Sequence, residues 1–390
     1  MKHLAIFLSM LPNEGGKFQY SLSLMLGLCA LDPAEYKISA IFYDRAWFIH
    51  VPKQANVECF QCQRIIPARL VRKILLTVPH GLSIWRRIGT IIDPVHKLLC
   101  KLKPDLMFYP GIDSLAYEVR LPSVVPIYDL MHRYEKDFPE VSMNGIFKDR
   151  ERHYINISRY AKGVLVDSEV GRKHALESYG FDHKRIYILP YVKPPYVENF
   201  ESSPEKPNGQ IPDRFIFYPA QLWKHKNHCG IIRAISLLKE KGLIVNAVFV
   251  GAKKNAAIDI INLIDELVLN DQIYFLGYVS DEELVWLYKN AVALVMPTFF
   301  GPTNVPPLEA FALGCPVITS NIYATPWQVG DAAILVDPGD CRDIAEKIEL
   351  VWTKEEVRQK LIQNGKRRDL EWNQYHFNKR VSEIVSNMIT

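Results

Sequence analysis

Short apolar segments alternate with helical patterns along most of the chain, which predicts strands that alternate with helices. In the first half, the predicted strands are residues 3–11, 37–43, 105–111, 124–130, 163–168 and 185–192. A helical pattern follows the first strand at residues 21–31, and further ones lie between several of the others. This alternation is typical of a mostly parallel sheet with helices on both faces.

Residues 193–213 interrupt the pattern, because they are rich in Pro, Ser and Glu and poor in apolar side chains. Such a composition predicts a linker between domains. A second series follows, with predicted strands at residues 214–220, 243–251, 272–277, 292–298, 316–320 and 332–337. Its predicted helices include residues 228–242, 257–269 and 281–291, and residues 341–389 are predicted to form two or three more. The expected fold class is therefore α/β, with two doubly wound parallel sheets.

Residues 297–319, PTFFGPTNVPPLEAFALGCPVIT, combine the end of a predicted strand with a loop and a helix. We expect this helix to begin near Pro306 and Pro307, to carry Glu309 in its first turn and to end at Gly314. Loop amides that lead into a helix N-terminus favour an anion, and here a carboxylate lies beside them. The segment therefore suits a charged ligand that is rich in hydroxyl groups.

The composition narrows the class of protein. A length of 390 residues predicts two domains, while 48% apolar and 23% charged residues are ordinary for a globular protein in water. The net charge of +4 argues against nucleic acid as the main partner. The apolar core of the N-terminus is too short for a signal peptide and lacks a cleavage site, and no apolar run is long enough to span a membrane. We therefore expect a cytoplasmic protein.

The seven cysteines are odd in number and scattered. Cys59 and Cys62 form a single CxxC with no second cysteine or histidine pair at zinc spacing, so we expect free thiols and no metal site.

Several polar or glycine positions directly follow predicted strands, which is where ligands bind in doubly wound sheets. Gly15 and Gly16 follow the first strand, and paired glycines let a phosphate approach the backbone, although an ordinary tight turn is the alternative. In the second half, the loop Gln221 to Asn227 carries three cationic or titratable side chains that suit a diphosphate, or it is a solvated loop. Further positions of this kind are Gly251, Tyr278 and Val279, where a nucleotide base would meet backbone or where the chain only turns.

Asp129 and His132 also follow a predicted strand, in PIYDLMHRYEKDFPE. An Asp–His neighbourhood beside Arg133 can orient a sugar hydroxyl or stabilise a leaving phosphate. A buried structural histidine is the alternative.

Taken together, these residues resemble a family-4-type retaining glycosyltransferase of the GT-B architecture, in which two Rossmann-like domains face each other across a cleft. The resemblance covers nearly the whole chain and is carried most clearly by VPPLEAFALGCPV. It implies that Glu309 binds the ribose hydroxyls of the donor nucleotide, that Lys226 neutralises the donor diphosphate, and that Gly16 belongs to the loop against the donor phosphates. DSEVGRKHAL, around Ser168 and Glu169, and EWNQYHFNKRVSEIV resemble further family segments, the latter a terminal helix that crosses back to the first domain.

The resemblance divides the chain into an acceptor-binding domain at residues 1–200, a linker at 201–213, a donor-binding domain at 214–368 and the crossing helix at 369–390. It implies a nucleotide sugar as donor substrate, no separate cofactor, and a glycan or lipid-linked oligosaccharide as acceptor. The implied role is the synthesis of surface polysaccharide such as O-antigen or capsule.

Three positions depart from the family pattern. Gly301 stands where the family has its first glutamate, Gln221 stands where an arginine is common, and Tyr128–Asp129 with His132 replaces a His–Asp pair. We expect Thr303, Asn304 and the backbone near Val305 to meet the donor sugar instead. The catalytic candidates are then Lys226, Asp129 and His132.

Two other functions fit parts of the pattern. A nucleotide-sugar epimerase or hydrolase would need a partner for Glu309, whereas a non-catalytic nucleotide-sugar-binding protein would explain the two missing charged residues. A basic amphipathic stretch between Arg64 and Lys103 adds a predicted contact with the inner membrane surface, for which an ordinary solvated helix face is the alternative.

Overall fold

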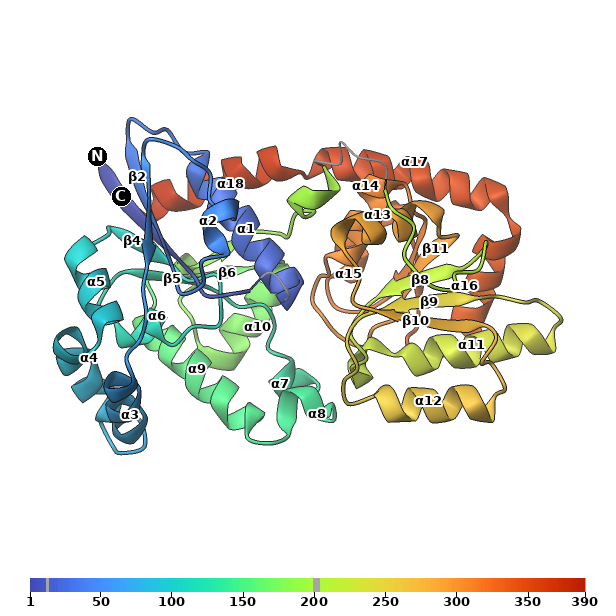
Figure 1. Cartoon of the computed structure of the whole chain (residues 1–390), viewed down its shortest axis with the longest axis horizontal. Coiled ribbons are helices and arrows are strands. Elements are labelled where there is room, and N and C mark those ends of the chain that lie inside the picture. Colours follow the sequence, from blue (N-terminus) through green and yellow to red (C-terminus); the bar gives the residue numbers. More distant parts are fainter. Residues whose placement is uncertain (12–13, 199–203, 390) are drawn as a thin grey trace. The chain divides into compact units, whose positions relative to one another are not determined.

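The computed structural model describes residues 1–11, 14–198 and 204–389, and the chain divides into two compact units. Unit 1 comprises Met1–Tyr128, Lys148–Pro190 and Gln374–Thr390, and unit 2 comprises Asp129–Phe147 and Tyr191–Asn373. Each unit is built around one parallel sheet, as the ribbon in Figure 1 shows.

Unit 1 contains a sheet in the order β3-β2-β1-β4-β5-β6-β7, and every pair is parallel. Its strands are β1 (Lys2–Leu8), β2 (Tyr36–Phe42), β3 (Val57–Gln61), β4 (Leu106–Phe108), β5 (Ser123–Pro126), β6 (Gly163–Val166) and β7 (Ile186–Ile188). The chain order reverses between β1 and β4, so the carboxyl ends of these two strands flank the switch point where doubly wound sheets bind ligands.

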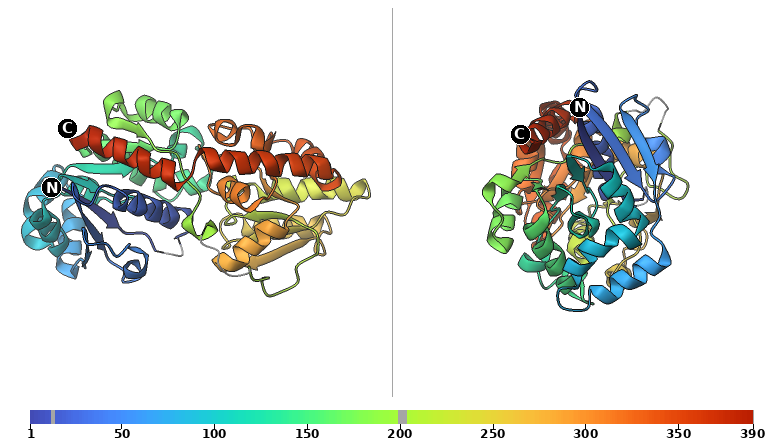
Figure 2. Two further views of the ribbon diagram at one scale, coloured as in Figure 1. Left: turned by 90° about the horizontal axis from the view of Figure 1, so that it is seen from above. Right: turned by 90° about the vertical axis from the view of Figure 1, so that its left-hand side faces the viewer.

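The helices of unit 1 come from residues 16–185 and from the C-terminal residues 374–389. They are α1 (Gly16–Cys29), α2 (Trp47–His50), α3 (Ile66–Leu75), α4 (Gly81–Ile92), α5 (Pro94–Leu102), α6 (Leu115–Glu118), α9 (Ile146–Tyr160), which starts in unit 2, α10 (Glu169–Tyr179), η2 (His183–Arg185) and α18 (Gln374–Ile389). The C-terminal α18 packs along α1, as the two views in Figure 2 show. A Cβ at Gly27 of α1 would lie only 3.0 Å from Val381, so glycine permits this close packing.

Unit 2 contains a second parallel sheet in the order β10-β9-β8-β11-β12-β13. Its strands are β8 (Ile216–Pro219), β9 (Ala247–Val250), β10 (Ile273–Gly277), β11 (Ala293–Met296), β12 (Val317–Ser320) and β13 (Ala333–Val336). α11 and α12 cover one face, while α13 and α14 cover the other (Figure 1). The helices are α7 (Met131–Tyr134), α8 (Pro139–Ser142), η3 (Pro195–Val197), η4 (Lys224–Lys226), α11 (His228–Glu240), α12 (Ala257–Glu266), α13 (Asp281–Asn290), α14 (Pro306–Leu313), α15 (Thr325–Val329), η5 (Gly330–Ala332), α16 (Cys341–Thr353) and α17 (Glu355–Glu371).

The segment Asp129–Phe147 belongs to unit 2 although the first-half strands precede it in sequence. Met131, Val141 and Phe300 form a small apolar cluster. The Tyr323 hydroxyl also donates to the Glu135 carboxylate. These contacts attach the segment to the loops that follow β11 and β12.

The expected α/β fold with two parallel sheets is confirmed, and each predicted strand overlaps an observed one. α14 begins at Pro306, and Gly314 ends it in the left-handed region at φ 71°. β3 was missed, because this edge strand is largely exposed and lacks an apolar run. Within the described ranges, no helix has both the length and the apolar character needed to cross a membrane.

Candidate functional site

The carboxyl ends of four neighbouring strands in unit 2 gather most of the predicted donor-binding residues. Gln221 and Lys226 follow β8, Gly251 follows β9, and Tyr278 and Val279 follow β10. The loop after β11 carries Thr303, Asn304 and Val305 and leads into α14 with Glu309. Because parallel strands end at one edge of the sheet, the fold brings these scattered positions together.

Lys226 ends the short helix η4, and its Nζ lies 3.4 Å from Oδ1 of Asn304 in the β11–α14 loop. The side chain is half-buried. Burial lowers the pKa of Lys226 to about 8, although the charge of Asp129 opposes this shift. The ammonium is therefore charged near neutral pH, which suits a ligand anion.

Glu140 of α8 holds the loop that carries Lys226 through hydrogen bonds. The Nδ1 of His225 lies 2.6 Å from Oε1 of Glu140, and the His225 N–H donates to the same oxygen at 2.8 Å. Asn255 donates to the other oxygen at 2.8 Å. Burial alone would raise the pKa of Glu140, but the hydrogen bonds from His225 and Asn255 lower it to about 2. Burial lowers the pKa of His225 to about 4, so a neutral imidazole faces a charged carboxylate.

Gly301 shapes the loop after β11. Its φ of +126° disfavours any side chain, and a Cβ there would lie 2.9 Å from the Asn304 amide. Gln328 holds the backbone of Asn304 on both sides, because its Oε1 accepts from the Asn304 N–H at 3.0 Å and its Nε2 donates to the Asn304 carbonyl at 2.6 Å. A glutamate at position 301 would not fit this conformation. The loop instead turns the Asn304 amide toward Lys226.

The start of α14 offers few free donors. Pro306 and Pro307 lack an N–H, and the Asn304 N–H is engaged with Gln328. The N–H of Val305 has no partner among the described residues, so it is the donor that remains for a ligand at this helix start. Thr303 is buried beside it.

Glu309 is buried in the first turn of α14 with two tyrosines as hydrogen-bond donors. The Tyr288 hydroxyl donates to Oε2 at 2.6 Å, and the Tyr196 hydroxyl donates to Oε1 at 2.8 Å. Burial raises the pKa of Glu309, although both hydrogen bonds counteract the rise. Since an ionised carboxylate accepts about four hydrogen bonds, the two tyrosines leave acceptor capacity for ligand hydroxyls.

Gly251 lets the ends of β8 and β9 approach each other. Its φ is +142°, and a Cβ would lie 2.6 Å from the Ala220 carbonyl oxygen. Gln221, next to Ala220, is exposed, and so is the ring of Tyr278, whereas Val279 is buried. An exposed aromatic ring at a strand end is a suitable surface for a nucleotide base.

The remaining predicted residues occupy different positions. Gly15, at φ 59°, and Gly16 lie in unit 1 at the start of α1, which has no side-chain cap. Asp129 accepts the N–H of Met131 at 2.9 Å and lies close enough to Lys226 for their charges to interact. His132 is fully buried and packs against Phe147 at 5.6 Å.

Sequence reasoning missed several residues that shape this site, namely Glu140, Tyr196, Asn255, Tyr288 and Gln328. Each acts through a contact that is distant in sequence, so no local motif marks it. Among the residues that the structure describes, no cluster of three or more His, Cys, Asp or Glu could hold a metal ion.

This chain is similar in sequence to known glycosyltransferases. Residues 199–368 match the family model of glycosyl transferases group 1, which confirms the resemblance drawn from VPPLEAFALGCPV. The chain is similar to O-antigen chain mannosyltransferase B of Escherichia coli, with 26% identity over 244 residues that cover 57% of this chain and 63% of the relative. Overall, the chain spans about half the length of the curated relatives it matches.

Solved structures share the fold over nearly the full length of this chain. WaaG, a glycosyltransferase involved in lipopolysaccharide biosynthesis, matches with a TM-score of 0.67 and 16% identity, over 98% of this chain and 99% of that one. Anabaena Alr3699/HepE in complex with UDP and glucose matches with a TM-score of 0.66 and 17% identity, over 99% of each chain. The identities are low, so these likenesses establish the fold, which is the GT-B architecture, and nothing further.

Proposed function

We propose that this chain, whose residues 199–368 match the family model of glycosyl transferases group 1, transfers a sugar from a nucleotide-sugar donor to a glycan or lipid-linked glycan acceptor. The proposal rests on the placement of Lys226. This partly desolvated cation lies at the strand-end edge of the unit 2 sheet and contacts Asn304 in the loop that leads into α14. When a nucleoside diphosphate leaves the donor sugar, negative charge grows on its phosphates, and a cation at this position would stabilise that charge.

We assign a role in donor binding to each of the residues at the strand-end edge of unit 2. Lys226 neutralises the diphosphate, the hydroxyls of the ribose meet Glu309, and the base lies against the backbone at Gly251 and Tyr278. The donor sugar meets Thr303, Asn304 and the Val305 N–H. The role of Gly15 and Gly16 at a phosphate stays a prediction.

We further propose that transfer proceeds with retention of the anomeric configuration and without a metal ion. In this mechanism the acceptor hydroxyl attacks on the face from which the diphosphate departs, and its proton passes to that diphosphate. Lys226 stabilises the developing charge, and Asp129 holds the Lys226 ammonium in its charged form. His132 is proposed to position the segment that carries Asp129, since its burial separates it from solvent.

The relation to an O-antigen mannosyltransferase supports a role in surface-polysaccharide synthesis. We also propose that the protein acts at the cytoplasmic face of the inner membrane. Incubation of the purified protein with UDP-, GDP- and ADP-sugars and lipid-linked acceptors tests the function. We expect a glycosylated product by mass spectrometry, an unchanged anomeric configuration by NMR, and full activity in EDTA.

Alternative functions give other results in the same experiment. Release of free sugar in place of a glycosylated product would indicate a hydrolase, and a donor that is converted to another nucleotide sugar would indicate an epimerase. Nucleotide binding without turnover of any donor would indicate a non-catalytic binding protein. Each of these results would overturn the transferase proposal.

The proposed membrane contact lies on α3. Ile66, Leu70 and Ile74 recur at helical spacing and are 71%, 57% and 65% exposed. Arg69 and Lys73 lie on the same helix and are also exposed. An apolar stripe flanked by cations suits the surface of an anionic bilayer, where the apolar side chains enter the interface and the cations meet phosphate groups.

Vesicle flotation tests this contact. The wild type is expected to float with phosphatidylglycerol vesicles and the variant Leu70→Glu/Ile74→Glu is expected to remain in the soluble fraction. Ile258→Glu, on α12 of unit 2, is the control because Ile258 is 73% exposed. Equal flotation of the wild type and the α3 variant would contradict the contact.

A further inference from the structure

A cavity of about 700 Å³ opens in unit 1 beside the carboxyl ends of β2 and β3. Tyr43 directly follows β2, and Gln63 and Arg64 follow β3. α3 supplies the rest of the wall, so the lining residues are Tyr43, Gln63, Arg64, Arg69, Arg72 and Lys73. The size is that of a pocket for a small ligand, and the position is the strand-end edge at which doubly wound sheets bind ligands.

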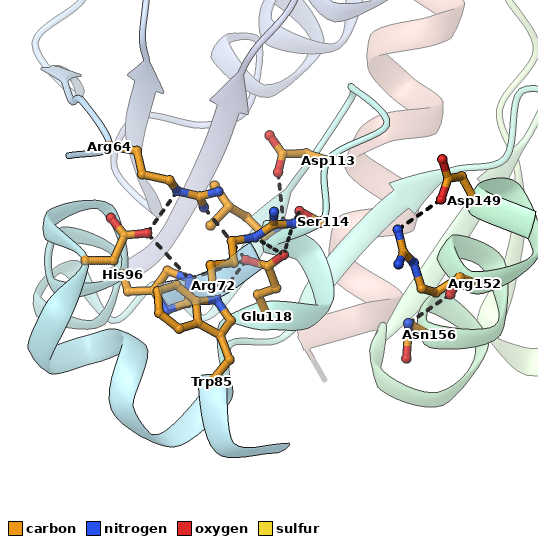
Figure 3. Close-up of polar contacts among 12 residues, drawn as sticks. Arg64, Arg72, Trp85, His96, Asp113, Ser114, Glu118, Asp149, Arg152 and Asn156 are labelled. Carbon is orange, nitrogen blue, oxygen red and sulfur yellow. Dashed lines mark hydrogen bonds and ion pairs between the residues drawn. The ribbon is translucent and has the colours of Figure 1, made fainter. Parts of the chain in front are cut away.

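Two of the four cations in the wall are held by carboxylates behind it. Arg72 donates from Nε to Glu118 at 2.8 Å and from Nη2 to Ser114 at 2.7 Å. Arg64 lies 2.9 Å from Asp93 through its Nε. Figure 3 shows the Arg72 guanidinium directed at Glu118 and Ser114. The carboxylates of Glu118 and Asp93 are completely buried, so they serve as fixed anchors for the arginines.

This anchoring leaves part of each guanidinium available. The Nη1 atoms of Arg64 and Arg72 have no hydrogen-bond partner among the described residues. Trp85 donates to the second oxygen of Glu118 at 3.0 Å, which fixes the carboxylate that holds Arg72. Although burial alone would raise the pKa of Glu118, hydrogen bonds from His96 and Arg72 lower it well below its ordinary value, so the anchor stays charged.

The other two cations have no acidic partner. Arg69 and Lys73 make no ion pair or side-chain hydrogen bond with any residue that the structure describes. Asp113 also interacts with both Arg64 and Arg72, and burial raises its pKa. Even with Glu118, Asp93 and Asp113 all charged, three carboxylates face four cations, so the wall carries a surplus of positive charge at α3. Guanidinium groups in a fixed orientation together with a lysine match the geometry and charge of phosphate.

We propose that this cavity binds a phosphoryl group of the acceptor, carried either by a sugar phosphate or by a lipid-linked pyrophosphate. The assignment of an acceptor rests on the proposed glycosyltransferase function, whereas the phosphate site itself does not. None of its residues belongs to the set proposed for the donor. The exposed apolar stripe of α3 borders the same cations, which favours the lipid-linked form.

Calorimetric titration with inorganic pyrophosphate tests the site. Every protein in the series carries Lys226→Gln, so that the donor loop does not contribute. The parent is expected to bind pyrophosphate, and Arg69→Gln/Lys73→Gln is expected to bind at least about tenfold more weakly, because two unpaired charges are lost. Arg87→Gln/Lys97→Gln is the matched control, since both residues are exposed cations of unit 1 outside the cavity.

Two further arms identify the source of the phosphate. A hexose phosphate is titrated in solution, and vesicles that contain a prenyl pyrophosphate lipid are compared with phosphatidylglycerol vesicles of equal surface charge, because Arg69 and Lys73 also belong to the proposed membrane contact. Binding of the hexose phosphate, or stronger binding to the vesicles with the prenyl pyrophosphate lipid than to the control vesicles, supports the site and identifies the source of the phosphate. In either case Arg69→Gln/Lys73→Gln is expected to abolish the binding. The proposal would be overturned if the parent did not bind pyrophosphate, or if both double variants bound it equally. The arginines and carboxylates of the wall would then have only a structural role. Because no sugar transfer is measured, failure of the donor site does not affect this result.

Discussion

The Nδ1 of His225 lies 2.6 Å from Oε1 of Glu140, which joins the loop before α11 to a helix that precedes it by more than eighty residues. The contact fixes the residue next to Lys226. His225 also stacks on Phe300 at 3.9 Å between ring centroids, so the same imidazole contacts the loop that carries Asn304. The position of the proposed donor-binding cation thus depends on three separate segments of unit 2.

Replacement of Glu140 by Gln is expected to destabilise the protein at neutral pH by about 1–3 kcal/mol, because His225 and Asn255 lose a charged acceptor. The pKa of Glu140 is about 2 against an ordinary value of 4.5, so its contribution is complete above pH 4.5 and is lost as the pH falls toward 2. Chemical denaturation across this range should show the difference between wild type and Glu140→Gln vanish at the acidic end. Glu282→Gln, an exposed glutamate of α13, should have no such effect.

Gly301→Ala is expected to cost about 1–3 kcal/mol of folding free energy, because φ is unfavourable and the new Cβ meets Asn304. Gly242→Ala is the matched control, since Gly242 also has positive φ, at +81°, but open space around its Cβ position. Denaturant midpoints measure both. A smaller loss at position 301 than at 242 would mean that the loop relaxes without cost and that Gly301 does not shape it.

The affinity for a nucleoside diphosphate is expected to fall as the pH rises through the pKa of Lys226, which is about 8. The deprotonated amine carries no charge for the phosphates, so one pH unit above the pKa the affinity should be about tenfold weaker. Calorimetric titration from pH 6.5 to 9.5 measures this profile. Lys226→Gln should show weak binding with no inflection near this pH, and an inflection that persists in the variant would assign the effect to another group.

Glu309→Gln separates the two ends of the donor. If Glu309 meets the ribose, the variant should bind both UDP and uridine about tenfold more weakly, because an amide nitrogen replaces an acceptor oxygen. Lys226→Gln should weaken only UDP. Titration of both ligands into both variants tests the assignment, and an effect of Glu309→Gln on UDP alone would place the carboxylate near the phosphates.

The local pattern of the sequence predicted most of the fold. The strands of both sheets and the bounds of α14 follow from apolar runs, prolines and Gly314, whose effects are local. β3 escaped prediction because its exposed side chains form no apolar run. The attachment of Asp129–Phe147 to unit 2, and the tyrosines that hold Glu309, depend on contacts between residues far apart in sequence. Lys226 and Glu309 could be proposed from the sequence because they lie within short motifs, whereas Glu140 lies in none.

The proposed role of Lys226 is tested by the rate at which nucleoside diphosphate is released from a panel of nucleotide sugars. This rate is compared among the wild type, Lys226→Gln and Lys224→Gln. Lys224 is an exposed lysine of the same loop, paired with Asp259 at 3.3 Å, so it controls for loss of charge. We expect release by the wild type, a rate about 100- to 1000-fold lower for Lys226→Gln, and little change for Lys224→Gln. Equal rates for the wild type and Lys226→Gln would show that Lys226 does not bear the charge of the leaving diphosphate.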